Sequence, residues 1–299
     1  MAVRHWLSWL GSILTLFASA AIAAPASVQD YTRQPRREPT ARIAYGPASA
    51  QVVELFLPKG RGPHPVVLLI HGGCYLAQFE GLAQTSGIAA DLAGRGYAVW
   101  NVEYRKLGEP GAGYPGTFLD VADAVGRIRT DAVRYNLDVQ RVVALGHSAG
   151  GHLALWAAGR HRLPKSSPLW RSDPQVIRAV ISLGGIGDLE GQGDVFAGAC
   201  GKEPIPQIIG AATRTAPYAD TSPAELLPLG AGIVMMSGVS DHVMPPFTGQ
   251  AFAERAQRAG DNAVSVAIAD AGHFDVVIPT TAAWKAVVKT LAREMARLR

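Results

Sequence analysis

Ser148 lies in a glycine-rich turn that could present its hydroxyl as a nucleophile. The sequence Gly146-His147-Ser148-Ala149-Gly150 follows the apolar run Arg141–Leu145 and leads into a helical stretch, His152–Gly159. A strand, a sharp turn and a helix around Gly-x-Ser-x-Gly hold the Ser in a strained conformation in which strand and helix pass very close to each other. Gly at positions 146 and 150 leaves room for this approach, so we predict that the turn lifts the Ser148 hydroxyl into a cleft.

A serine hydroxyl needs a base at neutral pH, and the base needs an acid that orients it. Two later apolar runs end near such residues: Ile233–Met236 leads to Asp241, and Val264–Ile268 leads to His273. In folds that carry this serine turn, the acid and then the His follow on loops after later strands. The sequence therefore predicts Ser148 as nucleophile, Asp241 as acid and His273 as base.

Neighbouring residues compete for the roles of base and acid. His242 is adjacent to Asp241 in the sequence, so Asp241 could hardly orient its ring. Asp270 and Asp275 flank His273 and are alternative acids, although their strand would place them beside the ring rather than beneath it. Asp241 also fits an ordinary turn aspartate, and this interpretation is the alternative to the orienting acid.

A developing oxyanion needs hydrogen-bond donors aimed at it. The N–H of Ala149 is one candidate, because it lies at the positive end of the helix that follows the serine. The loop His71-Gly72-Gly73-Cys74-Tyr75, which follows the apolar run Val66–Ile70, is the second candidate. Its glycines let the backbone approach a substrate closely, whereas the alternative is an ordinary glycine turn.

The elements that must position these residues alternate along the chain from about residue 50. Several short runs are continuously apolar, which is typical of strands covered on both faces. The runs are Val52–Leu57, Val66–Ile70, Tyr97–Val102, Arg141–Leu145, Ala179–Leu183, Ile233–Met236 and Val264–Ile268. Apolar residues spaced three and four apart mark helices at 118–128 and 284–298. This alternation predicts an α/β fold, with a doubly wound, mostly parallel sheet flanked by helices and ligands bound at the carboxyl ends of the strands.

The N-terminus has the three parts of a secretory signal. Arg4 precedes residues 6–24, which carry no charge and end with the Ala-x-Ala pattern Ala21-Ile22-Ala23. We predict a signal peptide over residues 1–23 and export to the periplasm or the medium, with no stable membrane span after cleavage; a retained N-terminal membrane anchor is the alternative. Residues 24–42, rich in Pro and Arg, are predicted to be a flexible arm that precedes a domain at 43–299.

The composition excludes several classes of protein. The chain has 299 residues, of which 48% are hydrophobic and 17% charged, as expected for one or two globular domains. Its net charge of +4 lies mostly in residues 1–42, which hold five Arg against Asp30 and Glu38, so we expect no nucleic-acid partner. The eight His show no metal-ligand spacing, and Gly184-Gly185-Ile186-Gly187 does not open a helix that would bind a pyrophosphate. We therefore expect neither a metal nor another cofactor.

These motifs resemble the α/β-hydrolase family. His71-Gly72-Gly73 resembles the oxyanion loop of hormone-sensitive-lipase-like esterases, arylformamidases and prolyl-oligopeptidase-like exported hydrolases, and the turn at 146–153 is similar to that of arylformamidase-like and carbohydrate-esterase-like members. The resemblance covers nearly everything from about residue 50 onward. It implies a triad of Ser148, Asp241 and His273, and oxyanion donors at Gly73, Cys74 and Ala149. Many relatives have Gly, or an aromatic followed by Trp, where this chain has Cys74 and Tyr75, so the pocket wall differs although backbone donation is retained.

Residues 187–217 are long, rich in Gly and Pro, and lie where such folds insert a lid. This segment contains Cys200, and the chain has two cysteines in all. Export would permit a disulfide between Cys74 and Cys200, but their separation in space does not follow from the sequence, so the pairing stays open. If the two residues pair, the disulfide ties the lid to the oxyanion loop.

The leading functional hypothesis is a serine hydrolase that cleaves a carboxylic ester of a small acyl substrate through an acyl-enzyme. An amidase or formamidase of arylformamidase type would use the same triad, and no residue separates the two because they differ in the leaving group. A catalytically inactive hydrolase fold that serves as a binding protein is the third alternative, which the presence of all three triad candidates disfavours. The expected partner is a small-molecule ester or amide.

Overall fold

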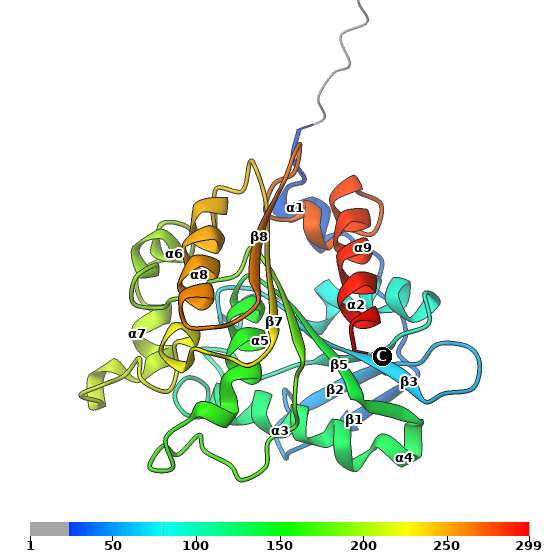
Figure 1. Ribbon diagram of the computed structural model, residues 1–299, viewed down its shortest axis with the longest axis horizontal. Coiled ribbons are helices and arrows are strands. Elements are labelled where there is room, and N and C mark those ends of the chain that lie inside the picture. The colour runs from blue at the N-terminus through cyan, green and yellow to red at the C-terminus, as the bar shows by residue number, and fades with distance from the viewer. Residues whose placement is uncertain (1–23, 80, 299) are drawn as a thin grey trace, which may run out of the picture.

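The computed structural model describes residues 24–79 and 81–298, in which a single eight-stranded sheet lies between two layers of helices (Figure 1). The strands are β1 (Ala41–Ala44), β2 (Val52–Phe56), β3 (His64–Ile70), β4 (Ala98–Val102), β5 (Leu137–His147), β6 (Ala179–Leu183), β7 (Gly232–Gly238) and β8 (Ala263–Ile268). The α-helices are α1 (Val28–Thr32), α2 (Gly81–Gly94), α3 (Gly116–Thr130), α4 (Ala132–Tyr135), α5 (Ala149–Gly159), α6 (Gly193–Cys200), α7 (Pro204–Ile209), α8 (Pro246–Arg258) and α9 (Ala282–Ala296). Short 3-10 helices are η1 (Arg160–Arg162), η2 (Ala211–Thr213), η3 (Pro223–Leu226) and η4 (Asp275–Val277). The predicted signal peptide at 1–23 lies outside the described residues.

The strand order is β1-β2-β4-β3-β5-β6-β7-β8. Neighbours from β4 to β8 run parallel, whereas β2 pairs antiparallel with both β1 and β4. The carboxyl ends of the parallel strands therefore meet at one edge of the sheet, where ligands bind in open α/β sheets. The prediction of a doubly wound, mostly parallel sheet is confirmed.

Both faces of the sheet are buried, as the continuously apolar strands require. In β3, Val66, Leu68 and Ile70 belong to the core under α3, α5 and α8, whereas Val67 and Leu69 belong to the core under α2 and α9. All five side chains are at most 1% exposed. A run without polar residues is thus needed because successive side chains enter opposite cores.

Each of the seven apolar runs predicted as strands forms a strand, with ends that differ by a few residues. The strand β1 was not predicted. Among the described residues it pairs with β2 alone, at the margin of the sheet, and Ile43 is the one buried side chain of this strand. An edge strand this short carries too few apolar residues to be recognised from the pattern.

Residues 24–42, which the sequence predicts to be a flexible arm, make contacts with the domain in the structure. Ser27 caps α1: its hydroxyl accepts from the Asp30 N–H at 3.2 Å, and the Asp30 carboxylate accepts from the Ser27 N–H at 2.9 Å. The Tyr31 side chain that follows is 2% exposed. A single buried aromatic anchors this segment, and one residue gives no periodicity that a sequence pattern could reveal.

The segment 187–217 contains α6 and α7, and it is closed down onto the domain. Phe196 of α6 and Ile208 of α7 are fully buried in the core that also contains α5.

Within the described ranges, no helix combines the length and the hydropathy that a membrane span requires.

Candidate active site

The Ser148 turn has the strained geometry that its sequence predicts. Ser148 lies between β5 and α5 with φ 53° and ψ −121°, a backbone conformation that residues other than glycine rarely adopt. A Cβ at Gly146 would lie 2.1 Å from the Gly150 carbonyl oxygen, and a Cβ at Gly150 would lie 2.2 Å from the Ile70 carbonyl oxygen. Both glycines are therefore required for β5, α5 and the end of β3 to meet at this turn.

The loops after β7 and β8 bring Asp241 and His273 together. The His273 Nδ1 lies 2.8 Å from Asp241 Oδ2, and both side chains are buried. The other Asp241 oxygen accepts from the backbone N–H groups of Val243 at 2.9 Å and Met244 at 2.8 Å. These bonds fix the carboxylate so that it can hold the imidazole in one tautomer and one orientation.

The competing residues lie elsewhere. His242 and Asp270 are exposed. Asp275 is buried, but its carboxylate accepts from the N–H groups of Gly272 at 2.8 Å and Ala26 at 2.9 Å, so it braces the His273 loop and the N-terminal segment. Among the described residues, the carboxylate that contacts the His273 ring is that of Asp241.

Gly184, which follows β6, makes room for the Asp241–His273 pair. Its φ is +51°, and a Cβ there would lie 2.8 Å from Asp241 Oδ2 and 2.9 Å from His273 Nδ1. In the sequence, this glycine stands out only as part of a candidate nucleotide loop, which the segment after it does not support. Its position at a strand end was the signal for a role in the site, but the close approach is visible only once β6 and β7 are paired.

The loop after β3 has the backbone expected of an oxyanion loop. Gly73, Cys74 and Tyr75 have φ values of 105°, 53° and 63°. Within the described part of the chain, the N–H groups of Gly73 and Cys74 have no backbone or side-chain acceptor. Ala149, the third predicted donor, is the first residue of α5, where N–H groups have no partner inside the helix.

A disulfide joins Cys74 to Cys200, with a Cα–Cα distance of 5.6 Å. The pairing that the sequence left open is therefore present in the structure. It connects the predicted oxyanion loop to Cys200, the last residue of α6, and so ties the segment 187–217 to this loop.

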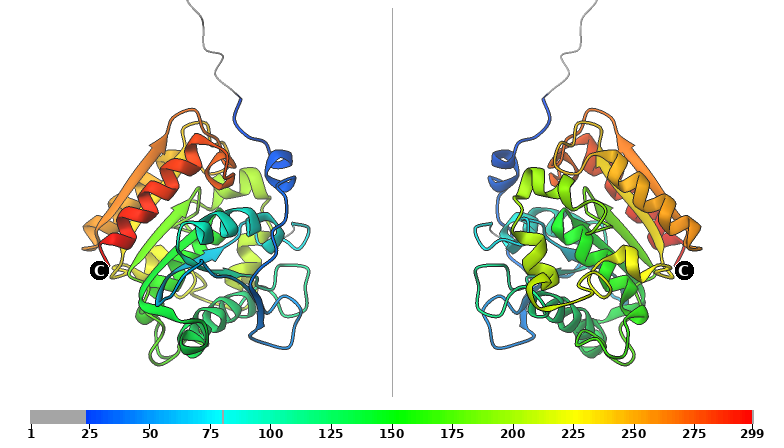
Figure 2. Two further views of the ribbon diagram at one scale, coloured as in Figure 1. Left: turned by 90° about the vertical axis from the view of Figure 1, so that its right-hand side faces the viewer. Right: turned by 90° about the vertical axis from the view of Figure 1, so that its left-hand side faces the viewer.

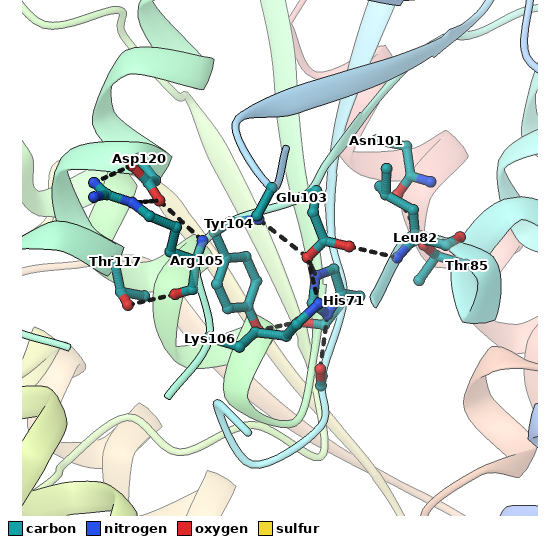
Figure 3. A network of polar contacts seen from close by, with 12 residues as sticks. His71, Leu82, Thr85, Asn101, Glu103, Tyr104, Arg105, Lys106, Thr117 and Asp120 are labelled. Atoms are coloured by element: carbon teal, nitrogen blue, oxygen red, sulfur yellow. Dashed lines mark hydrogen bonds and ion pairs between the residues drawn. The ribbon is translucent and has the colours of Figure 1, made fainter. Parts of the chain in front are cut away.

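A buried polar network holds the oxyanion loop from the other side (Figure 3). The His71 Nε2 lies 2.7 Å from Glu103 Oε1, and the Nδ1 lies 2.8 Å from the Gly72 carbonyl oxygen. The ring stacks on Tyr104 at a centroid distance of 4.4 Å, and Lys106 Nζ lies 3.0 Å from Glu103 Oε1. Sequence reasoning missed Glu103, whose signal was a carboxylate placed directly after a buried strand.

This network sets the direction of one predicted oxyanion donor. Burial alone would raise the pKa of Glu103, but the charges and hydrogen bonds of His71 and Lys106 lower it to about 2. A carboxylate and a carbonyl only accept hydrogen bonds, so the His71 ring is the donor in its contacts with Glu103 and with the Gly72 carbonyl. Because a trans peptide is planar, fixing the Gly72 carbonyl also fixes the Gly73 N–H, which points the opposite way.

His147, the variable residue of the serine turn, contacts the loop of the predicted base, His273. Its Nε2 lies 3.0 Å from the His273 carbonyl oxygen, so the ring donates this bond. Burial, and then the proximity of the His273 ring, hold the pKa of His147 well below its ordinary value. His147 is therefore a neutral residue that braces the backbone of His273.

Ser148 and His273 line a common cavity of about 230 Å³, together with Gly73 and Cys74. Most of the remaining wall is apolar, with rings from Tyr31, Phe79 and Phe274. Val28, Gln84, Ala199, Cys200, Val243 and His147 complete the lining. The six residues predicted for the site thus come from the ends of four strands, β3, β5, β7 and β8. 

Four of the six, namely Gly73, Cys74, Ser148 and His273, form the wall itself, while Asp241 contacts the His273 ring and Ala149 directly follows Ser148.

The fold and the site together define a member of the α/β-hydrolase superfamily. The order of the strands, the strained serine between β5 and α5, and the acid and His after β7 and β8 are the features that carry this assignment. More narrowly, the chain belongs to the BD-FAE family, whose family model matches residues 53–255.

Curated relatives are similar over parts of their length. A probable isoprenylcysteine alpha-carbonyl methylesterase of Arabidopsis thaliana is 25% identical over 252 residues, which are 79% of this chain and 51% of the relative. Esterase LipC of Mycobacterium tuberculosis is 28% identical over 118 residues, which are 39% of this chain and 28% of the relative. The chain thus spans about half the length of the first relative and a smaller share of the second.

Solved structures share the fold over most of the chain. Esterase B of Lactobacillus rhamnosis has a TM-score of 0.73 at 18% identity, with 89% of each chain covered. A truncated carbohydrate esterase from gut microbiota has a TM-score of 0.70 at 20% identity, with 92% of this chain and all of the other covered. Esterase 2 of Thermogutta terrifontis, phosphoramylated by tabun, has a TM-score of 0.69 at 20% identity and covers 89% of this chain and 97% of its own.

Proposed function

We propose that the chain is a serine hydrolase that cleaves a carboxylic ester of a small acyl substrate. The observation that carries the proposal is the contact of 2.8 Å between His273 Nδ1 and Asp241 Oδ2. The His273 side chain that makes this contact lines the same cavity as Ser148. In this proposal Ser148 is the nucleophile, His273 the general base and Asp241 the residue that orients it. The N–H groups of Gly73, Cys74 and Ala149 are the proposed oxyanion donors.

The proposed reaction proceeds through an acyl-enzyme. His273 takes the proton of the Ser148 hydroxyl as the oxygen attacks the ester carbonyl, and the negative charge passes to the carbonyl oxygen, where the backbone N–H groups stabilise it. Collapse of this intermediate expels the alcohol, which receives the proton from His273. Water then attacks the acyl-enzyme in the same way and releases the carboxylic acid, which restores Ser148.

The names of the similar proteins favour an ester over an amide. Those described above are esterases or a methylesterase, and none is described as an amidase or formamidase. The mostly apolar wall beside Ser148 fits a small uncharged group, since a buried charge there would need a partner. A formamidase remains the second candidate because the triad itself serves both reactions.

We also propose that the protein is exported. The charge-free residues 6–24 and the Ala21-Ile22-Ala23 pattern support a signal peptide. The Cys74–Cys200 disulfide supports the same conclusion, since disulfides persist mainly in oxidising compartments. Immunodetection of the full-length chain in periplasmic, culture and membrane fractions tests this: a protein found only in the cytosol would contradict it.

Covalent labelling tests the assignment of the nucleophile. A fluorophosphonate probe is expected to label the wild-type protein and not the Ser148→Ala variant, with a fall in kcat on the order of 10⁵-fold or more for the variant. Ser240→Ala is the matched control, because Ser240 is a partly exposed serine on the Asp241 loop and is expected to keep labelling. Equal labelling of the Ser148→Ala variant would show that another residue is the nucleophile.

A panel of short acyl esters, acetylated sugars and N-formylkynurenine then separates the two reactions. We expect turnover of at least one ester with a kcat/KM well above that for the formamide. Turnover of N-formylkynurenine alone would show a formamidase, and a folded protein that is neither labelled nor active would indicate a binding protein.

A further inference from the structure

The N-terminal segment 24–38 forms one wall of the cavity that contains Ser148. Val28 and Tyr31 of α1 both line this cavity. The Tyr31 ring stacks on Phe274 at 5.5 Å and meets the edge of His147 at 5.7 Å. Its partners are thus the residues directly beside the proposed base and the proposed nucleophile, so α1 reaches the centre of the site.

Both ends of the segment are fixed to the domain. At its start, the Ala26 N–H donates to Asp275 Oδ2 at 2.9 Å, the same oxygen that accepts from Gly272 beside His273. At its end, the Arg37 N–H donates to Ser86 Oγ at 3.2 Å, and Arg36 pairs with the buried Glu54 at 3.0 Å. The position of Tyr31 therefore follows from contacts on either side of α1 and not from its ring alone.

The lid forms the facing wall. Ala199 and Cys200 at the end of α6 line the same cavity, and the disulfide to Cys74 holds them in place. Figure 1 shows α1 on the side of α2 and α9, and α6 on the side of α8, at the same end of the sheet. Both side views in Figure 2 place α1 at this end of the molecule. One wall is covalently fixed, whereas the other is held by hydrogen bonds and aromatic packing.

The structure assigns a role in substrate selection to this segment: we propose that Val28 and Tyr31 limit the size of the ester group that the cavity accepts. The family model matches residues 53–255, so this wall is supplied by a part of the chain outside the matched region. The Tyr31 ring bounds this cavity of about 230 Å³, is 2% exposed and is held in place by its stacking on Phe274. In this proposal, a group that extends toward α1 meets the Tyr31 ring, and removal of the ring lengthens the space available on this side.

The proposal rests on the ester hydrolysis proposed above, and substitutions at two positions test it in opposite directions. Tyr31→Ala opens the wall and is expected to raise kcat/KM for a decanoyl ester relative to an acetyl ester by about tenfold or more, since each methylene in an apolar pocket contributes about 10-fold or more. Val28→Phe narrows the cavity and is expected to lower the ratio of hexanoyl to acetyl ester. The substrates are p-nitrophenyl esters that differ only in the acyl chain, and a parallel series of acetate esters varies the alcohol.

Tyr31→Phe is the matched control, because it keeps the ring and removes a buried hydroxyl that has no hydrogen-bond partner among the described residues. It is expected to keep the wild-type ratios in both series. A shift of the ratios by Tyr31→Ala or Val28→Phe in either series supports the proposal and identifies the group that occupies the cavity.

Unchanged ratios in both series, with folded variants by thermal melting, would overturn the proposed selection while leaving the hydrolase assignment intact. If Tyr31→Ala does not fold, Val28→Phe alone decides. A wild-type protein that hydrolyses no ester would instead show that the proposed function has failed.

Discussion

Glu103 does not line the cavity of Ser148, but its contacts hold one of the proposed oxyanion donors in place. Its carboxylate accepts a hydrogen bond from the His71 ring, and the same ring donates to the Gly72 carbonyl. The Gly73 N–H belongs to the same peptide as that carbonyl and points in the opposite direction. The Lys106 ammonium lies 3.0 Å from the same carboxylate oxygen, and the Leu82 N–H donates to the other oxygen at 3.1 Å. Together with the Tyr104 N–H, which donates at 3.2 Å, these make four groups that share the Glu103 carboxylate as their partner.

We expect Glu103→Gln to lower kcat by about 10²-fold, the cost of losing one oxyanion donor, with a smaller change in KM. The free energy of unfolding should fall by about 3 kcal/mol, because His71 and Lys106 lose a buried partner. Steady-state kinetics and urea denaturation at pH 7 measure the two effects. Glu254→Gln, an exposed glutamate on α8, is the control that should change neither.

The pH dependence of this contribution follows from the lowered pKa of Glu103. The folded-state value of about 2 lies below the ordinary 4.5, so the stabilisation is complete above pH 4.5 and is lost as the pH falls toward 2. The Glu103→Gln variant should therefore differ most from the wild type above pH 4.5. A constant difference down to pH 2, or a wild-type kcat, would contradict the role assigned to Glu103.

The sequence predicts catalytic candidates better than the residues that support them. Gly146 and Gly150 mark the Ser148 turn because their spacing is fixed along the chain, and Asp241 and His273 each follow a recognisable strand. Gly184 and Glu103 act through residues far away in the sequence, across paired strands. No local pattern records such a contact, so these two residues become visible only in the structure.

At the scale of elements, the disulfide is the link between the lid and the oxyanion loop. It joins α6 to the residue after Gly73 across a sequence separation of 126. A cross-link over a segment of this length restricts the unfolded chain strongly. It also limits how far the lid can move without moving Cys74, whose N–H is a proposed oxyanion donor.

We expect Cys200→Ser to lower the free energy of unfolding by about 2–5 kcal/mol and to lower kcat by a larger factor than it changes KM. Urea denaturation under oxidising conditions and steady-state kinetics measure these effects. The double variant Cys74→Ser with Cys200→Ser is the control: if the bond itself matters, it should match the single variant within experimental error. A single variant as stable and active as the wild type would show that the cross-link has no such role.

The elements were predictable to different degrees for physical reasons. The central parallel strands are buried on both faces, so their continuous apolar runs were sufficient to locate them. The edge strand β1 and the helix α1 each bury essentially one side chain, Ile43 and Tyr31, and so produce no periodicity. Prediction of the fold from the sequence therefore succeeded at the centre of the sheet and was incomplete at its margins, where α1 contributes to the cavity.

At the scale of the whole molecule, two histidines make folding depend on pH in a range where most carboxylates do not titrate. His147 and His152 flank the serine turn and are buried between the sheet and the neighbouring elements. Burial lowers the pKa of His152 to about 4, although its hydrogen bond to the Thr221 carbonyl oxygen at 2.8 Å opposes this shift. Burial also holds the pKa of His147 well below its ordinary value. Both residues are therefore neutral in the folded protein at pH values where they bind protons in the unfolded chain.

The consequence is a loss of stability as the pH falls from about 6.5 to about 4, because the unfolded state binds more protons than the folded state throughout this window. For His152 the loss between pH 7 and pH 4.5 should amount to about 2 kcal/mol, at about 1.4 kcal/mol per pKa unit. The free energy of unfolding from urea titrations at the two pH values should therefore differ by at least this amount in the wild type.

His152→Asn removes the titrating ring but keeps an N–H donor for Thr221, so the difference should shrink by about 2 kcal/mol. His242→Asn, an exchange at an exposed position, is the control that should leave it unchanged. A wild-type protein equally stable at both pH values would show that the two rings are protonated in the folded state without cost. The assignment of His147 and His152 as buried neutral residues beside Ser148 would then be wrong.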